Sequence, residues 1–508
     1  MNQVKAGAIL NYVIIGLNTL LGLLYTPYML HMLGQNEYGL YSLVASIIAY
    51  LTILDFGFGN AIVRYTAKFR AEGKLREQWE MFGMFLIVYT LIGFAAFLIG
   101  LGLYFNVEAL FERTMSAEEV AQARTMIMLL IVNLAITFPF SMFGSIITAY
   151  EDFVFQKVVA IVRLLLCTSV IILLLHVGYR AVAMVAAQTA FNIATLLLNY
   201  LYCVRKIKIK IAFSRFNRLF VKEITIYSFW LFLNTIMDRI YWSTGQFVLG
   251  AVVGTAAVAV YSVAILLQQM YMSFSTSIAN VLLPKITAMV SLDKGAREVS
   301  DLFIRTGRIQ CIVMSAVLSG FIVFGRGFID IWAGPEYATA YPITLIFFVS
   351  LFVPLIQNTG ITILQARNRM KFRSLLYLGI SFASLIGQVV LARRFGTMGC
   401  AVSIGAALII GQGLVMNIYY AKRQEIAIAR FWREIGRMMV VPAIFTVSGL
   451  LTTRYVDYSA PLVLVTGICV YLLLFVPAFW RWSMNGYERN LLLSPIKKLV
   501  AKYVVAVK

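Results

Sequence analysis

The chain has 508 residues, of which 61% are hydrophobic and 13% are charged, and its formal net charge is +21. Soluble domains contain roughly 45–50% apolar and about 25% charged residues, so this composition excludes a water-soluble fold. The basic excess does not indicate nucleic acid as a partner, because basic residues in membrane proteins gather in cytoplasmic loops and record orientation.

Fourteen apolar stretches are each long enough to cross a bilayer as a helix, which takes about 20 residues. In chain order they cover residues 7–30, 38–62, 80–105, 124–148, 157–178, 181–203, 224–249, 256–283, 302–325, 341–364, 373–392, 396–420, 437–455 and 459–480. We therefore predict an all-α integral membrane protein with about 14 transmembrane helices.

Basic residues concentrate in alternate loops between these spans. The loop after the second span and the loop after the sixth carry Arg64, Lys68, Arg70, Lys74 and Arg76, and Arg205, Lys206, Lys208, Lys210, Arg215, Arg218 and Lys222. Cytoplasmic loops are enriched in Lys and Arg, so the pattern places these loops and both termini in the cytoplasm.

Two segments 220 residues apart resemble each other. Residues 33–42 read LGQNEYGLYS and residues 253–262 read VGTAAVAVYS, so Gly34 aligns with Gly254 and Tyr41 with Tyr261. Both segments lead into even-numbered spans, as expected for a parallel transporter repeat of six plus six helices. A chance match between apolar sequences is the alternative.

The repeat predicts four parts. They are an N-terminal six-helix bundle at 1–210, a second six-helix bundle at 211–421, two additional spans at 422–480 and a cytoplasmic amphipathic tail at 481–508. The tail alternates apolar residues with Lys497, Lys498 and Lys502, a pattern that favours binding to anionic membrane lipids.

Few ionisable side chains lie within the spans, and each is a functional hypothesis because a charge at mid-bilayer costs about 2.5–3.5 kcal/mol. Asp238 and Arg239 lie near the centre of the seventh span, Asp55 in the second and Arg163 in the fifth. Asp238 and Arg239 could bind a ligand or pair structurally with other helices. Asp55 could be neutral, paired with arginine or able to exchange protons.

The remaining side chains give no sign of covalent chemistry. The two histidines and five cysteines show no spacing typical of metal ligands or of disulfides, so we expect no metal and no cofactor. The sequence also lacks a G-x-x-x-x-G-K-[ST] loop, which argues against direct use of ATP. It does not decide between coupling to H⁺, coupling to Na⁺ and uncoupled movement.

The chain resembles the polysaccharide transporter family of the multidrug/oligosaccharidyl-lipid/polysaccharide exporter superfamily, which includes O-antigen flippases. The resemblance is carried by Asn11 and Asn18, by YTPYMLHMLGQNEYGLYSLVASI at 25–47, by LDFGFGNAIVRY at 54–65, and by Tyr261, Ser262, Asn280 and Pro284. It implies two six-helix bundles related by a pseudo-twofold axis around a central cavity that opens alternately to each side. It also implies a location in the bacterial cytoplasmic membrane.

The family's substrate class implies an undecaprenyl-pyrophosphate-linked oligosaccharide moved to the outer leaflet for cell-surface polysaccharide, such as the O-antigen of lipopolysaccharide. A polysaccharide polymerase and a chain-length regulator are the partners implied. Cationic side chains are needed to bind a diphosphate, and amide side chains can form hydrogen bonds with sugar hydroxyls. The substrate-binding candidates are Arg239, Asp238, Asp55, Arg163, Arg64, Asn60, Asn280, Asn234, Gln268 and Gln269. Arg163 and Arg64 could instead extend to the inner membrane surface.

Two other functions fit parts of the sequence. A cation-coupled multidrug exporter of the same superfamily would favour an acidic cavity; the spans carry both acidic and basic groups, so charge alone does not exclude it. A membrane glycan polymerase or ligase would need a sizeable outer loop with catalytic side chains, and the outer loops around 106–123 and 326–340 are short. The sequence therefore favours a transporter and not an enzyme.

Overall fold

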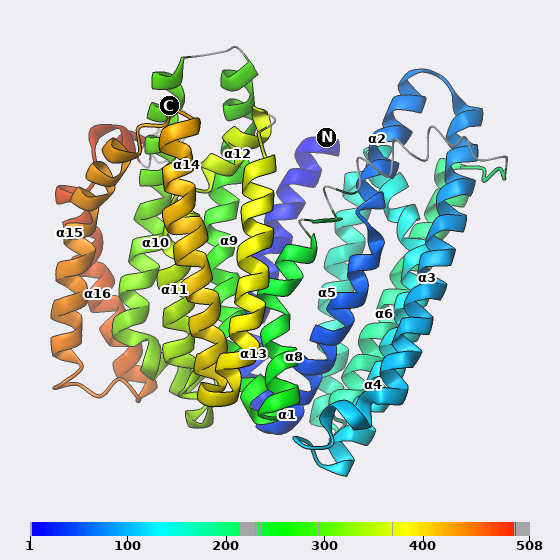
Figure 1. The fold of residues 1–508 in the computed structure, drawn as a ribbon, viewed down its shortest axis with the longest axis horizontal. Helices are drawn as coiled ribbons and strands as arrows, with labels where there is room; N and C mark the ends of the chain where they lie inside the picture. Colours follow the sequence, from blue (N-terminus) through cyan, green and yellow to red (C-terminus); the bar gives the residue numbers. More distant parts are fainter. Residues whose placement is uncertain are drawn as a thin grey trace, which may run out of the picture. The chain divides into compact units, whose positions relative to one another are not determined.

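The computed structural model describes residues 3–213, 229, 232–233, 235–291, 295–367, 369–491 and 493 (Figure 1). All regular secondary structure in these residues is helical. A membrane-spanning helix satisfies its backbone hydrogen bonds within the segment, which explains why long apolar runs fold in this way. The predicted all-α fold is confirmed.

The chain divides into two compact units, and the first comprises Met1–Ser262 and Leu385–Cys400. Within it α3 packs along α4, α4 along α6, and α1 along α5. Tyr65, Phe82, Phe85 and Phe143 are buried where α2, α3 and α4 meet. Its elements are α1 (Gln3–Leu51), η1 (Thr52–Asp55), α2 (Phe58–Ala71), α3 (Leu75–Phe111), α4 (Ala117–Ala149), α5 (Phe153–His176), α6 (Ala181–Tyr202), η2 (Cys203–Ile207) and α8 (Thr244–Val252).

The second unit comprises Val263–Ser384 and Ala401–Lys508, so α9 and α13 contribute residues to both units. Here α10 packs against α11, α15 and α16. The elements are α9 (Thr255–Ser291), α10 (Ala296–Trp332), η3 (Pro335–Tyr337), α11 (Ala340–Ile356), α12 (Thr359–Ala366), α13 (Lys371–Leu408), η4 (Ile409–Val415), α14 (Met416–Arg423), α15 (Ile428–Thr452) and α16 (Pro461–Trp482).

Ten helices in the described part of the chain are long and apolar enough to cross a membrane, and the pair α11–α12, bent by 47°, gives an eleventh. The stretches Ile9–Ala71 and Lys371–Arg423 have 63 and 53 residues, about three times the roughly 20 that one crossing needs. Gly34 and Gly396 interrupt them with φ values of 75° and 55°.

Glycine adopts positive φ readily because it has no Cβ, so each of these glycines can divide a long helix into two crossings. Figure 1 shows α1 running to one end of its unit before the chain returns along the second crossing to α2. With both stretches counted as two crossings, the helices follow the fourteen predicted spans. The exception is 224–249, part of which lies outside the described residues.

The start of α6 is fixed by an acidic residue distant in sequence. The Glu37 carboxylate accepts a hydrogen bond from the Ala181 backbone N–H at 2.9 Å, and its other oxygen lies 2.9 Å from Arg180 Nη1. Because the first N–H groups of a helix have no intrahelical partner, this carboxylate caps α6. Glu37 therefore ties the loop of the first repeat segment to the sixth span.

A buried ion cluster holds the appended spans to the second unit. Arg308 on α10 contacts Glu434 on α15 at 2.8 Å and Glu488, in the short helix after α16, at 2.5 Å. Arg308 also donates to the Ser483 carbonyl at 3.2 Å. The Arg308 and Glu488 side chains are only 7% and 1% exposed, so this cluster anchors α15 and α16 to α10 in a dry environment.

The predicted amphipathic tail at 481–508 is described only in its first part. Residues 486–491 are helical, and the Asn485 side chain accepts from the Glu488 N–H while Glu488 accepts from the Asn485 N–H. This reciprocal pair is a capping box that starts the helix. Beyond residue 493 the tail lies outside the described residues, and the predicted domain boundaries remain predictions.

Candidate functional site

The second crossing is interrupted where the sequence reads DFGFGN. The helix passes into η1, which ends at Asp55, and α2 begins only at Phe58. Between them Phe56 and Gly57 have left-handed backbones with φ values of 50° and 71°. Helix ends leave backbone N–H and C=O groups without intrahelical partners. The break therefore places polar backbone groups inside a membrane-spanning segment, as in the discontinuous helices of transporters.

The Asp55 carboxyl bridges this break. It lies near the Gly57 backbone N–H and near the hydroxyl of Tyr89 on α3. The Tyr89 hydroxyl in turn contacts Ser141 on α4 and the Gly59 backbone N–H. Tyr89 is 1% exposed, so its position is fixed by packing, whereas Asp55 is half-buried. This arrangement holds a carboxyl group at a fixed position within the span.

Polar side chains extend from this break along α4 and α6. Asn192 donates from Nδ2 to Asn133 Oδ1 at 2.7 Å and to Thr137 Oγ1 at 2.8 Å. All three are half-buried, and Thr137 lies one turn from Ser141 on α4. We name Asp55, Tyr89, Asn133, Thr137, Ser141 and Asn192 the polar cluster. Uncharged donors and acceptors dominate it, which suits ligands that carry hydroxyl groups.

The helix with Asp238 and Arg239 passes beside the break. The rings of Phe56 and Phe232 are 4.6 Å apart. Asp238 is exposed and Arg239 is half-buried, both within the helical residues 235–242. Two charged residues predicted as binding candidates therefore share the first unit with Asp55.

Arg64 and Arg163 occupy different helices of the same unit. Arg64 is exposed on α2, with its guanidinium 5.6 Å from the Tyr65 ring centroid. Arg163 is half-buried on α5, one turn from Cys167. The structure thus distributes Arg64, Arg163 and Arg239 over three helices of the first unit.

The predicted amides have diverse surroundings. Asn60 is exposed at the start of α2, and Gln269 is exposed on α9. Gln268 is 1% exposed and its amide nitrogen lies 2.6 Å from Met272 Sδ, so it is part of the packing of the second unit. Asn234 and the side chain of Asn280 lie outside the described residues.

Sequence reasoning missed Tyr89, Ser141, Asn133, Thr137 and Asn192. The signal was present as a polar residue at every fourth position of α4, from Asn133 through Thr137 to Ser141 and Ser145. Residues four apart lie on one face of a helix, so this pattern predicts a polar stripe within an apolar span.

Comparison with known proteins identifies the family. Residues 4–290, more than half of the chain, match the family described as "Polysaccharide biosynthesis protein". The chain belongs to this family. The match confirms the family resemblance predicted from the sequence.

Curated and solved relatives agree with this assignment. The "Uncharacterized membrane protein EpsK" of Bacillus subtilis (strain 168) is 21% identical over 415 residues, covering 80% of this chain and 81% of EpsK. The lipid II flippase MurJ in an inward closed conformation is 17% identical with a TM-score of 0.72, covering 94% of this chain and 98% of MurJ.

A second solved structure broadens the comparison. An inward-facing multidrug resistance MATE family transporter of the MOP superfamily is 15% identical with a TM-score of 0.62, covering 81% of this chain and 99% of that chain. At these identities the two solved structures establish a shared fold. The family member is therefore a multi-pass membrane protein with the fold of this superfamily.

Proposed function

We propose that this family member moves an undecaprenyl-pyrophosphate-linked oligosaccharide from the inner to the outer leaflet of the cytoplasmic membrane, by alternating access. The match of residues 4–290 to a polysaccharide biosynthesis family carries the proposal. The similarity in fold to a lipid II flippase supports it, because lipid II flipping is the activity named for that neighbour. The product would serve cell-surface polysaccharide assembly, including O-antigen, with a polymerase and a chain-length regulator acting next.

The polar cluster supports a sugar-bearing substrate. Sugar hydroxyls both donate and accept hydrogen bonds, and the Asn133, Thr137 and Asn192 side chains offer the same chemistry. The cluster lies within apolar helices, where exposing polar groups to lipid is costly. A transported glycan would explain why these side chains occur at this depth.

The diphosphate would bind to arginine. Guanidinium groups form short, charge-assisted and bidentate hydrogen bonds with phosphate oxygens. Arg239, on the segment whose Phe232 contacts the helix break, is the candidate we assign to the diphosphate, with Asp238 balancing or orienting the charge. Arg163 and Arg64 are further candidates on α5 and α2. The lipid tail would remain in the bilayer.

Reconstitution tests this proposal directly. Purified protein is placed in vesicles with an isoprenyl diphosphate disaccharide that carries a fluorophore on the sugar, and an impermeant quencher reports the leaflet. We expect protein-dependent exchange between leaflets that the Arg239→Ala variant loses. Protein vesicles no faster than empty vesicles would contradict the proposal.

An experiment in cells distinguishes the proposed flippase from a drug exporter of the same fold. Deletion of the gene should remove the surface glycan without changing drug accumulation, and the wild-type gene should restore the glycan. Increased drug accumulation with a normal surface glycan would favour the multidrug exporter and overturn the flippase proposal.

A further inference from the structure

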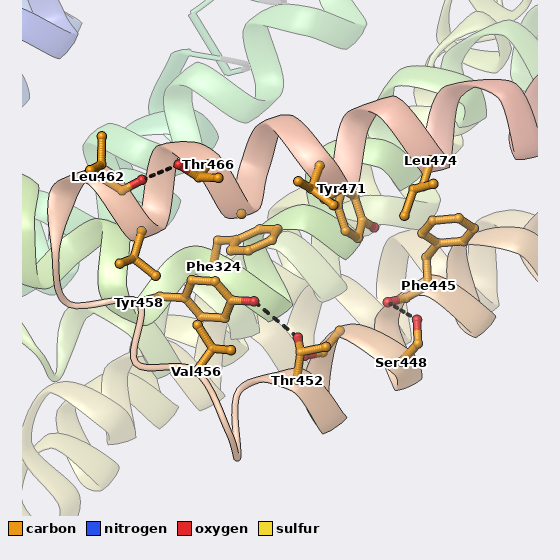
Figure 2. Close-up of a pocket in the computed structure, with 14 residues that line it drawn as sticks. Phe324, Phe445, Ser448, Thr452, Val456, Tyr458, Leu462, Thr466, Tyr471 and Leu474 are labelled. Atoms are coloured by element: carbon orange, nitrogen blue, oxygen red, sulfur yellow. Dashed lines mark hydrogen bonds between the residues drawn. The ribbon is translucent and has the colours of Figure 1, made fainter.

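The second unit contains an apolar groove between α10, α15 and α16, with a volume of about 610 Å³ (Figure 2). Phe324, Phe445 and Tyr471 form its aromatic wall, with Tyr471 edge-on to both phenylalanines at centroid distances of 5.5 and 5.7 Å. The lining of α16 extends from Leu462 to Leu474. The groove thus offers a continuous apolar surface on one side of the appended spans.

A polar pocket of about 620 Å³ continues from one end of this groove. Val456 and Tyr458 line both, so the two spaces adjoin at the loop between α15 and α16. The polar pocket is lined by two basic and two acidic side chains together with Tyr341. The charged residues are Arg326, Asp330, Arg454 and Asp457.

The two arginines and two aspartates of this pocket give it no net charge, and one aspartate oxygen lacks a hydrogen-bond donor. Asp330 Oδ1 is buried and has no hydrogen-bond partner among the described residues. A carboxylate without enough donors is costly to bury, and Asp330 lines this pocket, so a cation bound in the pocket would compensate its charge. The Ser459 backbone N–H donates to Asp457 Oδ1 at 3.0 Å and lowers the pKa of Asp457, which keeps this loop carboxyl ionised.

We infer that the groove and the polar pocket together bind one bilayer phospholipid whose head group carries both a phosphate and an ammonium group, such as phosphatidylethanolamine. The phosphate lies between Arg326 and Arg454, and the ammonium donates to Asp330 and Asp457. One acyl chain lies in the groove beside Tyr471. This site goes beyond the proposed transport function, because the lipid is a bound component and not the cargo.

Size and charge favour this occupant over the lipid-linked substrate. The groove follows α16 for twelve residues, which is about 18 Å at 1.5 Å per residue, close to half of a hydrocarbon core about 30 Å thick. An acyl chain of one leaflet has this length, whereas a long isoprenoid tail exceeds it. Two arginines offset by two aspartates suit a zwitterion, whereas a diphosphate needs an excess of cations.

Native mass spectrometry of the purified full-length protein tests this site. The protein is titrated with phosphatidylethanolamine, with phosphatidylglycerol of the same acyl chains, and with a polyisoprenyl diphosphate. We expect at least tenfold tighter binding of phosphatidylethanolamine than of phosphatidylglycerol. Equal binding of both phospholipids would mean unselective annular contact and would overturn the inference, as would displacement of bound phosphatidylethanolamine by the polyisoprenyl diphosphate.

Variants locate the site. Arg454 lies in an exposed loop, and the Arg454→Ala change should weaken phosphatidylethanolamine binding about tenfold. Arg113 is an exposed arginine of the first unit, and the Arg113→Ala change should leave this binding unaltered. Asp330→Asn should remove the preference for the ammonium head group. Val470→Trp fills the groove and should block binding, whereas Val465→Trp, on the same helix outside the groove, should preserve it.

Unchanged lipid selectivity in both the Arg454→Ala and the Val470→Trp protein would contradict the proposed lipid site. Either protein is first checked for a melting temperature near that of the wild type, and the head-group and groove variants give independent readings if one fails to fold. Leaflet exchange of the fluorescent disaccharide is measured separately. Failure of the lipid site and failure of the transport proposal therefore give different results.

Discussion

Gly39 on α1 lies directly against the first turn of α9 at Thr255. A Cβ atom at residue 39 would be 1.9 Å from the Thr255 carbonyl oxygen and 3.2 Å from the Ala259 amide nitrogen. With the repeat offset of 220 residues, Ala259 is the partner of Gly39. Gly34 and Gly254, also partners, both have positive φ, as expected if the two segments share a local backbone turn.

We expect Gly39→Val to destabilise the first unit, because the new side chain would overlap the Thr255 carbonyl. Overpacking of this kind costs about 1–3 kcal/mol. The change is measured as a shift of the melting temperature in detergent, with aggregation of the unfolded protein as the signal. Gly102→Val is the matched control, because a Cβ at Gly102 on α3 has nothing within 4 Å. Equal melting temperatures for the two variants would show that the contact is not close.

Arg308→Met should destabilise the second unit strongly. The change leaves the Glu488 carboxylate, 1% exposed, buried without its arginine, and breaking a buried ion pair by removing one partner costs about 3–5 kcal/mol. The control is Arg430→Met, whose pair with Asp301 joins the same two helices at 2.7 Å but is 51% and 34% exposed. An exposed pair contributes about 0–1 kcal/mol. The two melting temperatures should therefore differ clearly.

A double variant distinguishes a lost attraction from a stranded charge. Arg308→Met with Glu488→Met removes both buried charges, so it should be more stable than Arg308→Met alone. Further destabilisation by the second substitution would show that the apolar pair does not pack in this space. Glu434 remains in both proteins and is 31% exposed, so solvent can partly compensate its charge.

The fold could be predicted from the sequence because membrane spans are local signals. About 20 apolar residues, loop charges and two related glycine segments are visible without knowledge of contacts. The ion cluster around Arg308 could not be predicted, because Glu488, which pairs with Arg308, lies 180 residues away in the sequence. From sequence, Arg308 is one basic residue near the inner end of a span and Glu488 is one acidic residue in the tail.

The candidate site was predictable only in part for the same reason. Asp55 is conspicuous as a carboxyl group in an apolar span, but its proximity to Tyr89 depends on how α3 packs against η1. The break itself had a sequence signal, since Gly57 and Gly59 flank Phe58. Gly59 also permits close approach, because a Cβ there would lie 3.1 Å from Ser145 Oγ.

Tyr89→Phe should impair transport while leaving the protein folded. The change removes the hydroxyl that faces Asp55, and an ordinary intramolecular hydrogen bond contributes about 0.5–1.5 kcal/mol. If the position of Asp55 governs transport, the initial rate of leaflet exchange should fall about tenfold, since 1.4 kcal/mol corresponds to a factor of ten. Tyr12→Phe, at an exposed tyrosine on α1, is the control. A wild-type rate for Tyr89→Phe would show that the Tyr89 hydroxyl is not needed for transport.

Arg239→Ala should abolish glycan export with membrane abundance intact, because the diphosphate would lose its guanidinium partner. Arg239→Lys should restore export only partly, since an ammonium group cannot make the bidentate contact. Surface glycan per cell, normalised to protein in the membrane fraction, is the measurement. Arg205→Ala provides an exposed basic control on η2. Full export by Arg239→Ala would exclude Arg239 from substrate binding.

Cysteine labelling tests the predicted orientation, on which the direction of transport depends. In a variant without the five natural cysteines, Glu72→Cys lies between α2 and α3 and Asp457→Cys between α15 and α16. The basic residues around Glu72 predict a cytoplasmic position, whereas the loop at Asp457 follows an odd-numbered span and should face outward. An impermeant maleimide added to intact cells should therefore label Asp457→Cys and spare Glu72→Cys. Lysed cells should label both, and the opposite pattern in intact cells would invert the topology and the proposed direction of movement.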